Sequence, residues 1–223
     1  MKLVTLYQEH LGDWVVYLLP ALALSIEIAI FSILVAGLVG LPIAVMKMSR
    51  SRPLRYAANA YIEVLRGSPA LVQLYFIYFG LTAFGITLDA LPAAVITFGL
   101  NGAAYMAEIY RGGLRAVDAG QSHAAYALGM TPVQTLRYVL LPQSWRVVLP
   151  PAGSLAVAIF KDSSLATTIA VPELMNQATL LVGIWYTPFA VFLLVAVMYA
   201  AVALPATIYI RRRDRSRSWA ETA

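Results

Sequence analysis

Long apolar stretches separated by short polar segments dominate this sequence. The first runs from about residue 17 to 46, and others cover about 70–84, 92–110, 145–165 and 188–210. A helix needs about 20 consecutive apolar residues to cross the hydrocarbon layer of a bilayer. The pattern therefore predicts an all-α membrane protein, in which a single domain, residues 1–223, contains five transmembrane helices.

Basic residues mark one side of the predicted spans. Of the 16 Lys and Arg residues, 14 lie in the segments 47–66, 111–146 and 211–217. Loops on the cytoplasmic side of a membrane carry an excess of Lys and Arg. We therefore expect the N-terminus outside and the C-terminus in the cytoplasm, followed there by a basic tail, residues 211–223.

Small side chains recur along the first apolar stretch at four-residue spacing. The set consists of Ser25, Ala29, Ser32, Ala36 and Gly40. Helices in lipid associate through small residues, which let their backbones approach closely. This stripe predicts a close-packing face on the first span.

Prolines and polar residues divide the other stretches. Pro53 begins a segment that is too polar for hydrocarbon, for which we expect an interfacial helix, and the second span that follows it is short and aromatic. Pro150 and Pro151 are predicted to bend or interrupt the fourth span, because they lack N–H donors and their rings clash with the preceding turn. A short outer helix is expected around 172–181.

Composition excludes several kinds of site. The chain is 61% hydrophobic and 12% charged, has no cysteine, and has only two histidines, His10 and His123. These numbers argue against a soluble domain and leave no basis for a metal centre or thiol chemistry. The segment pattern of the basic residues explains the net charge of +5 without nucleic-acid binding. No phosphate-binding GxxxxGK[ST] motif and no catalytic triad pattern occurs, so we expect no catalytic residues and no bound cofactor.

The polar loop 112–142, between the third and fourth spans, begins with a signal for a short helix. Asp118 is placed to cap it, with Gln121 at the third helical position, and Gly129 is placed to end it. Its small side chains, expected to be exposed so that another surface can approach the backbone, are Ala119, Ala124, Ala125 and Ala127.

A second helix start follows directly in the same loop. Thr131 is placed as its cap, Pro132 occupies the first helical position, and Gln134 the third. Proline costs nothing at that position, since the first N–H of a helix has no partner within the helix. The loop therefore carries two capped helices, on the predicted cytoplasmic side.

The densest polar group at membrane depth is Lys161, Asp162, Ser163 and Ser164. Charged residues inside a membrane are rare and either pair with each other or mark a substrate path. The zwitterion of an amino acid suits the group, with its carboxylate on Lys161, its ammonium on Asp162, and hydrogen bonds from the two serines. A mutual ion pair that stabilises a broken helix fits the same residues equally well.

Other polar residues in the spans are weaker candidates for the substrate path. Asn101 and Glu108 lie seven residues apart, and so on one face of a helix. An ion pair between Glu108 and Arg111 is the preferred interpretation of that carboxylate. The same spacing favours an ion pair between Glu63 and Arg66, and the remaining candidate in the second span is Gln73.

Several phrases of this sequence resemble those of membrane subunits of bacterial ABC importers. The loop reads Gly120-Gln121, His123-Ala124-Ala125, Gly129 and Leu141-Pro142, which resembles the EAA motif of that family. His123 stands where the family usually has Glu. The phrases YIEVLRGSPALVQ, AAYMAEIYRGG, KDSSL and VPEL resemble the subfamily of polar amino-acid permeases for histidine, glutamine, glutamate, arginine and opines. The KDSSL resemblance favours a functional role for Lys161 and its neighbours.

The resemblance implies a permease subunit with a type I ABC importer fold in the bacterial inner membrane. Its implied partners are two ATP-binding cassette ATPases, which use ATP and Mg²⁺, a second permease that is identical or a sister, an extracytoplasmic solute-binding protein, and an amino-acid-like solute. The implied mechanism is alternating access, with ATPase closure pulling on the 118–129 helix and the motion passing through the 118–142 loop to the spans.

Two other classes of protein are also compatible with a bundle of apolar helices. A secondary transporter or channel works without ATP, and it is expected to carry more coupling acids in its spans and to need no capped helices in an inner loop. A membrane scaffold without transport activity is a weaker alternative.

Overall fold

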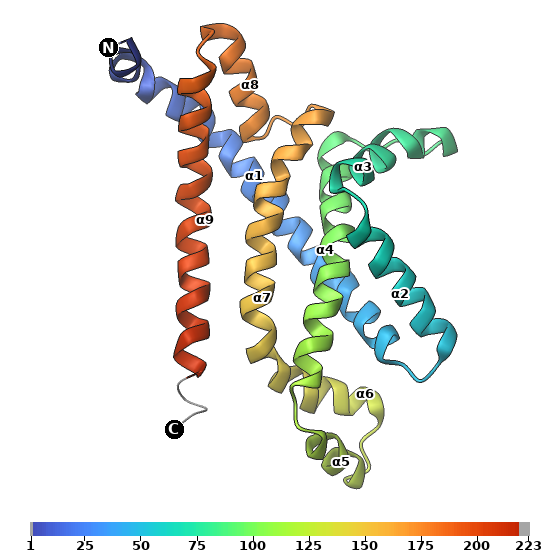
Figure 1. Cartoon of the computed structure of the whole chain (residues 1–223). Coiled ribbons are helices and arrows are strands. Elements are labelled where there is room, and N and C mark those ends of the chain that lie inside the picture. Colours follow the sequence, from blue (N-terminus) through green and yellow to red (C-terminus); the bar gives the residue numbers. More distant parts are fainter. Residues whose placement is uncertain (1, 219–223) are drawn as a thin grey trace.

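The computed structural model describes the backbone of residues 2–218 and the side chains of residue 7 and residues 10–212. Most of the predicted basic tail, 211–223, therefore lies outside the described side chains. The described chain is almost entirely helical (Figure 1). Its elements are α1 (Lys2–Met48), α2 (Arg52–Gly67), α3 (Ala70–Tyr75), α4 (Ala90–Arg115), α5 (Ala119–Ala127), α6 (Pro132–Gln134), α7 (Leu141–Asp162), α8 (Leu174–Trp185) and α9 (Pro188–Ser218), with π-helical turns at Phe76–Gly80 and Thr135–Leu140 and 3₁₀ turns at Leu81–Phe84 and Ser163–Ile169.

Three helices of the described chain are long and apolar enough to cross a membrane by themselves: α1, α4 and α9. Two further candidates are bent pairs. One joins 52–67 to 70–84 at 106°, and the other joins 132–169 to 174–185 at 53°. Three to five spans are therefore compatible with the structure, and the predicted five is the upper figure.

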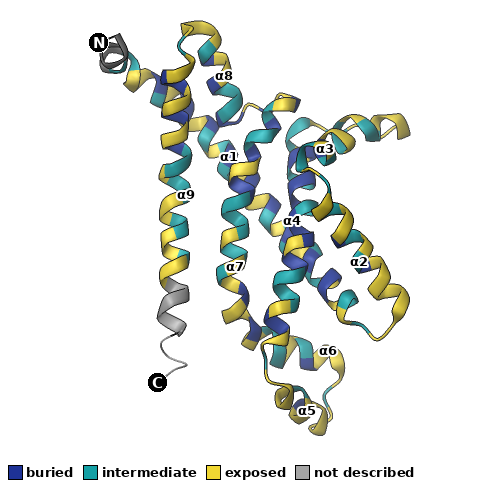
Figure 2. Cartoon of the chain, in the orientation of Figure 1, coloured by how far each residue is buried: buried dark blue, intermediate teal, exposed yellow. Residues whose placement is uncertain are grey.

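The small-residue stripe on α1 is the face that packs against α4. Ser32 and Ala36 are fully buried, a Cβ built on Gly40 would lie 2.9 Å from Met106 Cβ of α4, and one built on Gly99 of α4 would lie 2.6 Å from Val35 Cβ of α1. Ser32 also donates a hydrogen bond to the carbonyl of Val95, at 3.3 Å. Figure 2 shows buried residues gathered along α4 and on the parts of α1 and α7 beside it. The predicted close-packing face is confirmed.

The helices that contain the first two predicted spans differ from those spans in length. Helix α1 begins at Lys2, well before residue 17, and continues to Met48. The 70–84 stretch is helical, but at about 1.5 Å per residue it reaches only about 23 Å, too short to cross the hydrocarbon alone. It qualifies as a span only together with α2, from which it is bent away.

The predicted interruption at Pro150 and Pro151 is wrong. Helix α7 runs without interruption from Leu141 through both prolines to Asp162. The two missing N–H groups leave the carbonyls of Arg146 and Val147 without their usual helical donors. Both residues are exposed near the loop end of the helix, where neighbouring groups or water can satisfy a carbonyl.

The third and fifth predicted spans correspond to α4 and α9, each of which extends beyond the predicted range. The short helix expected around 172–181 is α8, which begins at Leu174 and continues to Trp185. Helix α8 and the turn to α9 lie at one end of the molecule, and α5 and α6 at the other (Figure 1).

Candidate functional site

Helix α5 lies at one end of the molecule, in the loop that joins α4 to α6 and α7 (Figure 1). Asp118 caps it as predicted, but its side chain accepts from the N–H of Gly120, at 2.8 Å, and makes no reciprocal box with Gln121. A Cβ on Gly120 would lie 2.7 Å from that carboxylate oxygen, so a larger residue there would require the Asp118 side chain to shift. Gln121 instead accepts from the amide of Gln143, at 3.0 Å, which ties α5 to the start of α7.

The C-terminal end of α5 is a Schellman motif. Gly129 has a φ of 79°, its N–H donates to the carbonyl of Tyr126 at 3.0 Å, and the N–H of Met130 donates to that of Ala125 at 3.1 Å. Glycine adopts this left-handed conformation without the Cβ penalty of other residues. The predicted end of the helix at Gly129 is thus confirmed, one turn before the second helix begins.

The second capped helix forms as the sequence predicts. Gln134 N–H donates to the hydroxyl of Thr131 at 3.3 Å, and the N–H of Thr131 donates to the side-chain oxygen of Gln134 at 2.8 Å, with Pro132 at the first helical position. This helix does not stop within the loop. It continues through the π-helical turn into α7, where Pro142 lies in the first turn.

The outer face of α5 is a surface of small side chains with one imidazole. Ala119, His123, Ala124 and Ala127 are exposed, whereas Ala125 is 3% exposed, because α5 packs with that side on the turn Thr135–Leu140. The expectation that Ala125 is exposed is therefore wrong. Large apolar side chains of the same loop are exposed as well: Tyr126, Leu128, Val133 and Tyr138.

At the far end of α7, the structure separates the members of the Lys161 group. Ser163 is buried and donates to the carbonyl of Phe160 at 2.7 Å, and Ser164 donates to that of Lys161 at 2.8 Å. Both hydroxyl protons are therefore used within the helix. Lys161 and Asp162 are exposed, and no ion pair joins them in the described part of the chain.

Lys161 lines a cavity of about 350 Å³ between α7, α8 and α9. Its other lining residues are Ser164, Met175, Phe192, Val195, Ala196 and Tyr199. Asp162 is not among them. A cavity with one ammonium group and mostly apolar or aromatic walls suits an anion that has an apolar portion.

Behind this cavity lies Glu173, a carboxylate that the sequence analysis did not single out. It is fully buried and caps α8, accepting from the N–H groups of Met175 and Asn176 at 2.9 and 2.8 Å. The hydroxyls of Tyr199 in α9 and Ser25 in α1 also donate to it, at 3.1 and 3.3 Å. The only feature of the sequence that could have indicated this role is the position of Glu173 just before a helix, in the phrase VPEL.

Asn101 and Gln73, two of the predicted substrate-path residues, come together at the bend between α2 and α3. The amide of Asn101 donates to the carbonyl of Leu65 at 2.9 Å and to the side-chain oxygen of Gln73 at 3.1 Å. Gln73 in turn donates to the same carbonyl at 2.8 Å. These amides tie the bend to α4, and Ser68 is a further acceptor.

Glu63 lies apart from that cluster, exposed on α2. The expected ion pair between Glu63 and Arg66 does not occur among the described residues. The guanidinium of Arg66 instead lies 5.0 Å from the centre of the Tyr105 ring, a cation–π distance. Neither the cavity of Lys161 nor the amide cluster includes Glu63.

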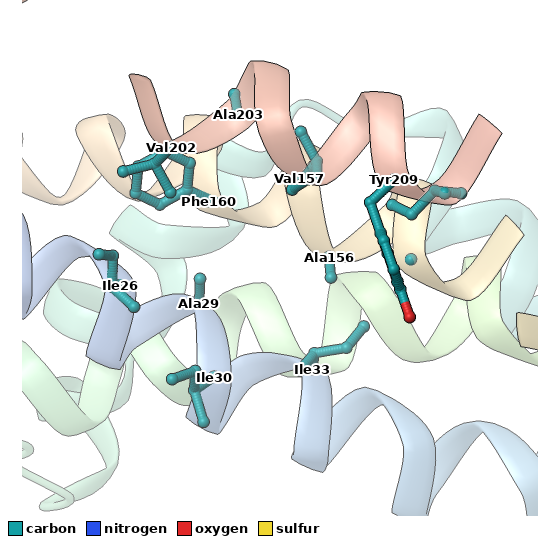
Figure 3. Close-up of a pocket in the computed structure, with 13 residues that line it drawn as sticks. Ile26, Ala29, Ile30, Ile33, Ala156, Val157, Phe160, Val202, Ala203 and Tyr209 are labelled. Atoms are coloured by element: carbon teal, nitrogen blue, oxygen red, sulfur yellow. The ribbon is translucent and has the colours of Figure 1, made fainter. Parts of the chain in front are cut away.

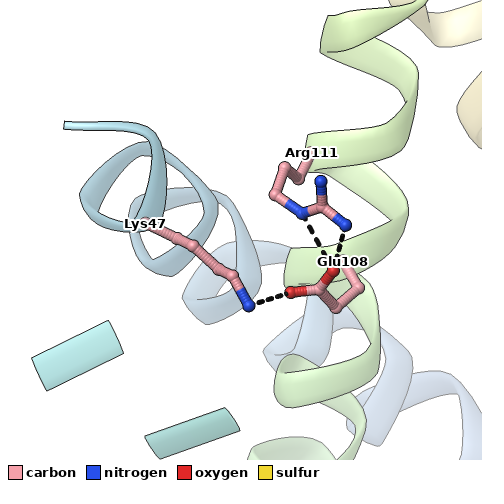
Figure 4. A network of polar contacts seen from close by, with 3 residues as sticks. All are labelled: Lys47, Glu108 and Arg111. Atoms are coloured by element: carbon pink, nitrogen blue, oxygen red, sulfur yellow. Dashed lines mark hydrogen bonds and ion pairs between the residues drawn. The ribbon is translucent and has the colours of Figure 1, made fainter. Parts of the chain in front are cut away.

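Glu108 forms an ion triad near the loop end of α4 (Figure 4). One carboxylate oxygen lies 2.6 Å from the ammonium of Lys47, and the other accepts from two nitrogens of Arg111 at 2.9 and 2.6 Å. The predicted pair with Arg111 is confirmed, and Lys47 was missed because it lies in another helix. Glu108 and Asn101 therefore take part in separate sets of polar contacts.

A separate groove of about 310 Å³ lies between α1, α7 and α9. Figure 3 shows its walls, with Ile30 and Ile33 from α1, Phe160 from α7 and Val202 from α9. None of its lining residues is charged. It therefore lacks the groups that recognise a zwitterion, and the Lys161 cavity is the better candidate for a solute.

Comparison with known proteins assigns this architecture to a family. Residues 32–218 match the family described as the binding-protein-dependent transport system inner membrane component. The probable amino-acid ABC transporter permease protein YckA of Bacillus subtilis is 38% identical over 86% of this chain and 85% of its own length. The octopine transport system permease protein OccM of Rhizobium meliloti is 37% identical over 85% of this chain and 81% of its own length.

Solved structures agree with the sequence matches. A chain of an amino acid ABC transporter crystallised with histidines superposes with a TM-score of 0.82 at 34% identity, covering 92% of this chain and 96% of the other. A chain of the MetNI methionine ABC transporter, in inward-facing form, gives 0.69 at 20% identity, covering 88% and 95%, which supports the likeness of the fold alone.

Proposed function

The chain belongs to the family of binding-protein-dependent transport system inner membrane components, and we propose that it is the permease subunit of an ATP-driven importer for a polar amino acid or related solute. Its relatives are permeases of amino-acid ABC transporters. The observation that carries the proposal is α5, a capped helix with an exposed face of small side chains, hydrogen-bonded through Gln121 to the start of α7.

In this proposal α5 is the coupling helix that docks on a separate ATPase. Exposed Ala119, Ala124 and Ala127 let a partner approach the helix backbone, and the larger apolar side chains around them supply contact area. Motion of the ATPase passes from α5 into the helical chain that begins at Pro132. The spans then alternate between outward-facing and inward-facing arrangements, and ATP and Mg²⁺ are used only by the partner.

The proposed topology has five spans, with the N-terminus outside and the C-terminus in the cytoplasm. Three of them are the single helices α1, α4 and α9. The second span is the bent pair that contains α2 and α3, and the fourth is the helical chain that contains α7. The clustering of Lys and Arg supports this orientation, since it places α5 and the end of α9 on the cytoplasmic side. The proposed location is the bacterial inner membrane, and one domain, 1–223, includes all five spans.

Lys161 is the proposed contact for the carboxylate of the solute. It is the only charged residue that lines its cavity, and its helix already satisfies the neighbouring serines. Asp162 is the proposed partner of the solute's ammonium group. Because it does not line the same cavity, the contact with Asp162 requires a solute that extends around the end of α7 or a rearrangement during transport.

The proposed assembly contains two ATPase subunits, a second permease that is identical or a sister, and an extracytoplasmic solute-binding protein. Co-expression with ATPase and binding-protein genes from the same operon, followed by reconstitution in liposomes, tests it. The expected result is ATP hydrolysis that rises on addition of a polar amino acid with its binding protein. A stable permease that transports without an ATPase would instead indicate a secondary transporter or channel.

A further inference from the structure

We propose that Glu173 is a positioning residue for solute recognition, which holds Met175 and Tyr199 in place as two walls of the Lys161 cavity. This inference rests on the proposed function of that cavity. Glu173 itself does not line the cavity, and so it acts through the residues that it binds. Its chemical role is that of a buried acceptor shared by three helices.

The first step concerns α8. The two oxygens of Glu173 accept the N–H groups of Met175 and Asn176, which otherwise have no partner in the first turn of a helix. Ser25 of α1 accepts the next free donor, the N–H of Leu174, at 3.2 Å. The start of α8 is thereby fixed to α1, and the side chain of Met175 leaves this fixed turn toward the cavity.

The second step concerns α9. Tyr199 donates its hydroxyl to Glu173, and its ring lies 5.3 Å from that of Phe160 in α7, centre to centre. These two contacts, one at the hydroxyl and one at the ring, hold the Tyr199 side chain in one orientation. The aromatic wall of the cavity is therefore set by Glu173 from one side and by Phe160 from the other.

The third step is the chemistry of the solute. Lys161 and Ser164 supply the polar groups of the cavity, and the remaining walls are apolar or aromatic. A solute held by its carboxylate on Lys161 places its own side chain against Met175 and Tyr199. Small changes of fit at an apolar wall change affinity by about 10- to 200-fold per methylene. The position of these two residues therefore selects among amino acids by side-chain size.

The test is equilibrium binding of tritiated L-arginine, L-glutamine and L-cystine to the assembled permease–ATPase complex in nanodiscs, without the binding protein. Glu173→Gln replaces an acceptor oxygen with an NH₂ group, which leaves one buried donor unpaired. We expect it to weaken binding of the preferred amino acid by about 10- to 150-fold, the range for one lost charged hydrogen bond. We also expect the ratio of affinities among the three amino acids to change.

Tyr199→Phe is expected to change the same ratio in the same direction. The double variant is expected to bind amino acids no more weakly than Glu173→Gln alone, because both single changes act on the same hydrogen bond between Tyr199 and Glu173. Asp89→Asn is the matched control. Asp89 also precedes a helix, but its side chain makes no capping hydrogen bond, so we expect wild-type binding.

Each result decides between defined conclusions. An unchanged affinity ratio, with all amino acids weakened equally and the melting temperature lowered, would reduce Glu173 to a structural residue and overturn the inference. If Lys161→Met weakens binding while Glu173→Gln and Tyr199→Phe match Asp89→Asn, the inference fails and the proposed cavity survives. If neither Lys161→Met nor Glu173→Gln changes binding, or the wild type binds none of the three, both fail.

Discussion

The ammonium nitrogen of Lys47, in the last turn of α1, lies 2.6 Å from a carboxylate oxygen of Glu108 in α4. Arg111 holds the other oxygen, so the carboxylate is shared between two cations. The side chains of Lys47 and Glu108 are 25% and 20% exposed, so water screens the pair only in part. The contact fastens α1 to α4 shortly before the chain enters the loop that contains α5.

Removing this carboxylate is expected to destabilise the protein. We expect Glu108→Ala to lower the free energy of unfolding by about 1–2 kcal/mol, between the values for exposed and buried pairs, because it leaves two neighbouring cations unpaired. Thermal unfolding in detergent at low salt and at high salt measures this, and salt is expected to shrink the difference. Arg115→Met, a change at an exposed cation of the same helix, serves as control. Equal effects of the two variants would contradict the role of the triad.

Two glycines near the coupling loop are expected to respond oppositely to alanine. Gly129 has a positive φ, so Gly129→Ala is expected to cost about 1–2 kcal/mol and to fray the end of α5. Gly112 is helical with open space around it, so Gly112→Ala is expected to stabilise α4 by about 0.5–1 kcal/mol. Hydrogen–deuterium exchange of residues 119–127 reports the first effect. Slower exchange in Gly129→Ala would refute the Schellman end.

Close approach of α1 and α4 makes Gly99 intolerant of substitution. Gly99→Ala would bring its Cβ within 2.6 Å of Val35, and we expect a loss of about 1–3 kcal/mol. The double variant Gly99→Ala, Val35→Gly, which removes the Cβ of Val35, is expected to recover part of it. Gly183→Ala, in open space on α8, is the control for the thermal unfolding measurement. A failure of the double variant to recover would mean that another contact limits the approach.

His123 tests whether α5 docks on an ATPase. His123→Asp puts a negative charge in the middle of the exposed face, and we expect solute-stimulated ATP hydrolysis to fall by about 5-fold or more, the lower end of usual coupling energies. Arg212→Ala, at an exposed position of α9, is expected to have a smaller effect. Similar, negligible changes in both would remove His123 from the interface.

Lys161 and Asp162 separate two interpretations of the polar group. If Lys161 binds the carboxylate, Lys161→Met is expected to weaken solute binding at least about 10-fold. Asp162→Asn is expected to have the smaller effect, since Asp162 does not line the cavity. Binding to the reconstituted permease–ATPase complex measures both. The reverse order would place the recognition site on the side of Asp162.

Features that depend on neighbours in the sequence were predicted well. The capping box of Thr131 and Gln134 involves residues three apart, and the stripe that contains Ser32 and Ala36 follows from helix geometry. The apolar runs predicted α4 and α9, since burial in lipid requires little detail beyond length and composition. The resemblance to ABC importer permeases, stated from short phrases, is confirmed by the family match.

Features that depend on distant residues were missed. The box expected between Asp118 and Gln121 does not form, because Gln121 bonds to Gln143 instead. Glu173 draws its partners from α1 and α9, up to 148 residues away in sequence. Local patterns contain no information on which side chain a fold will bring to such a group.

Helix α7, which is continuous from Leu141 to Asp162, can act as a lever arm that begins at the loop end of this subunit. At 1.5 Å per residue, about 30 Å separates Leu141 from Lys161 along α7. A tilt of about 5° around the Leu141 end would move the Lys161 end by about 2.6 Å, close to the width of a water molecule. A small tilt of α7 at one surface of the membrane therefore displaces its other end far enough to open or close a passage near the opposite surface.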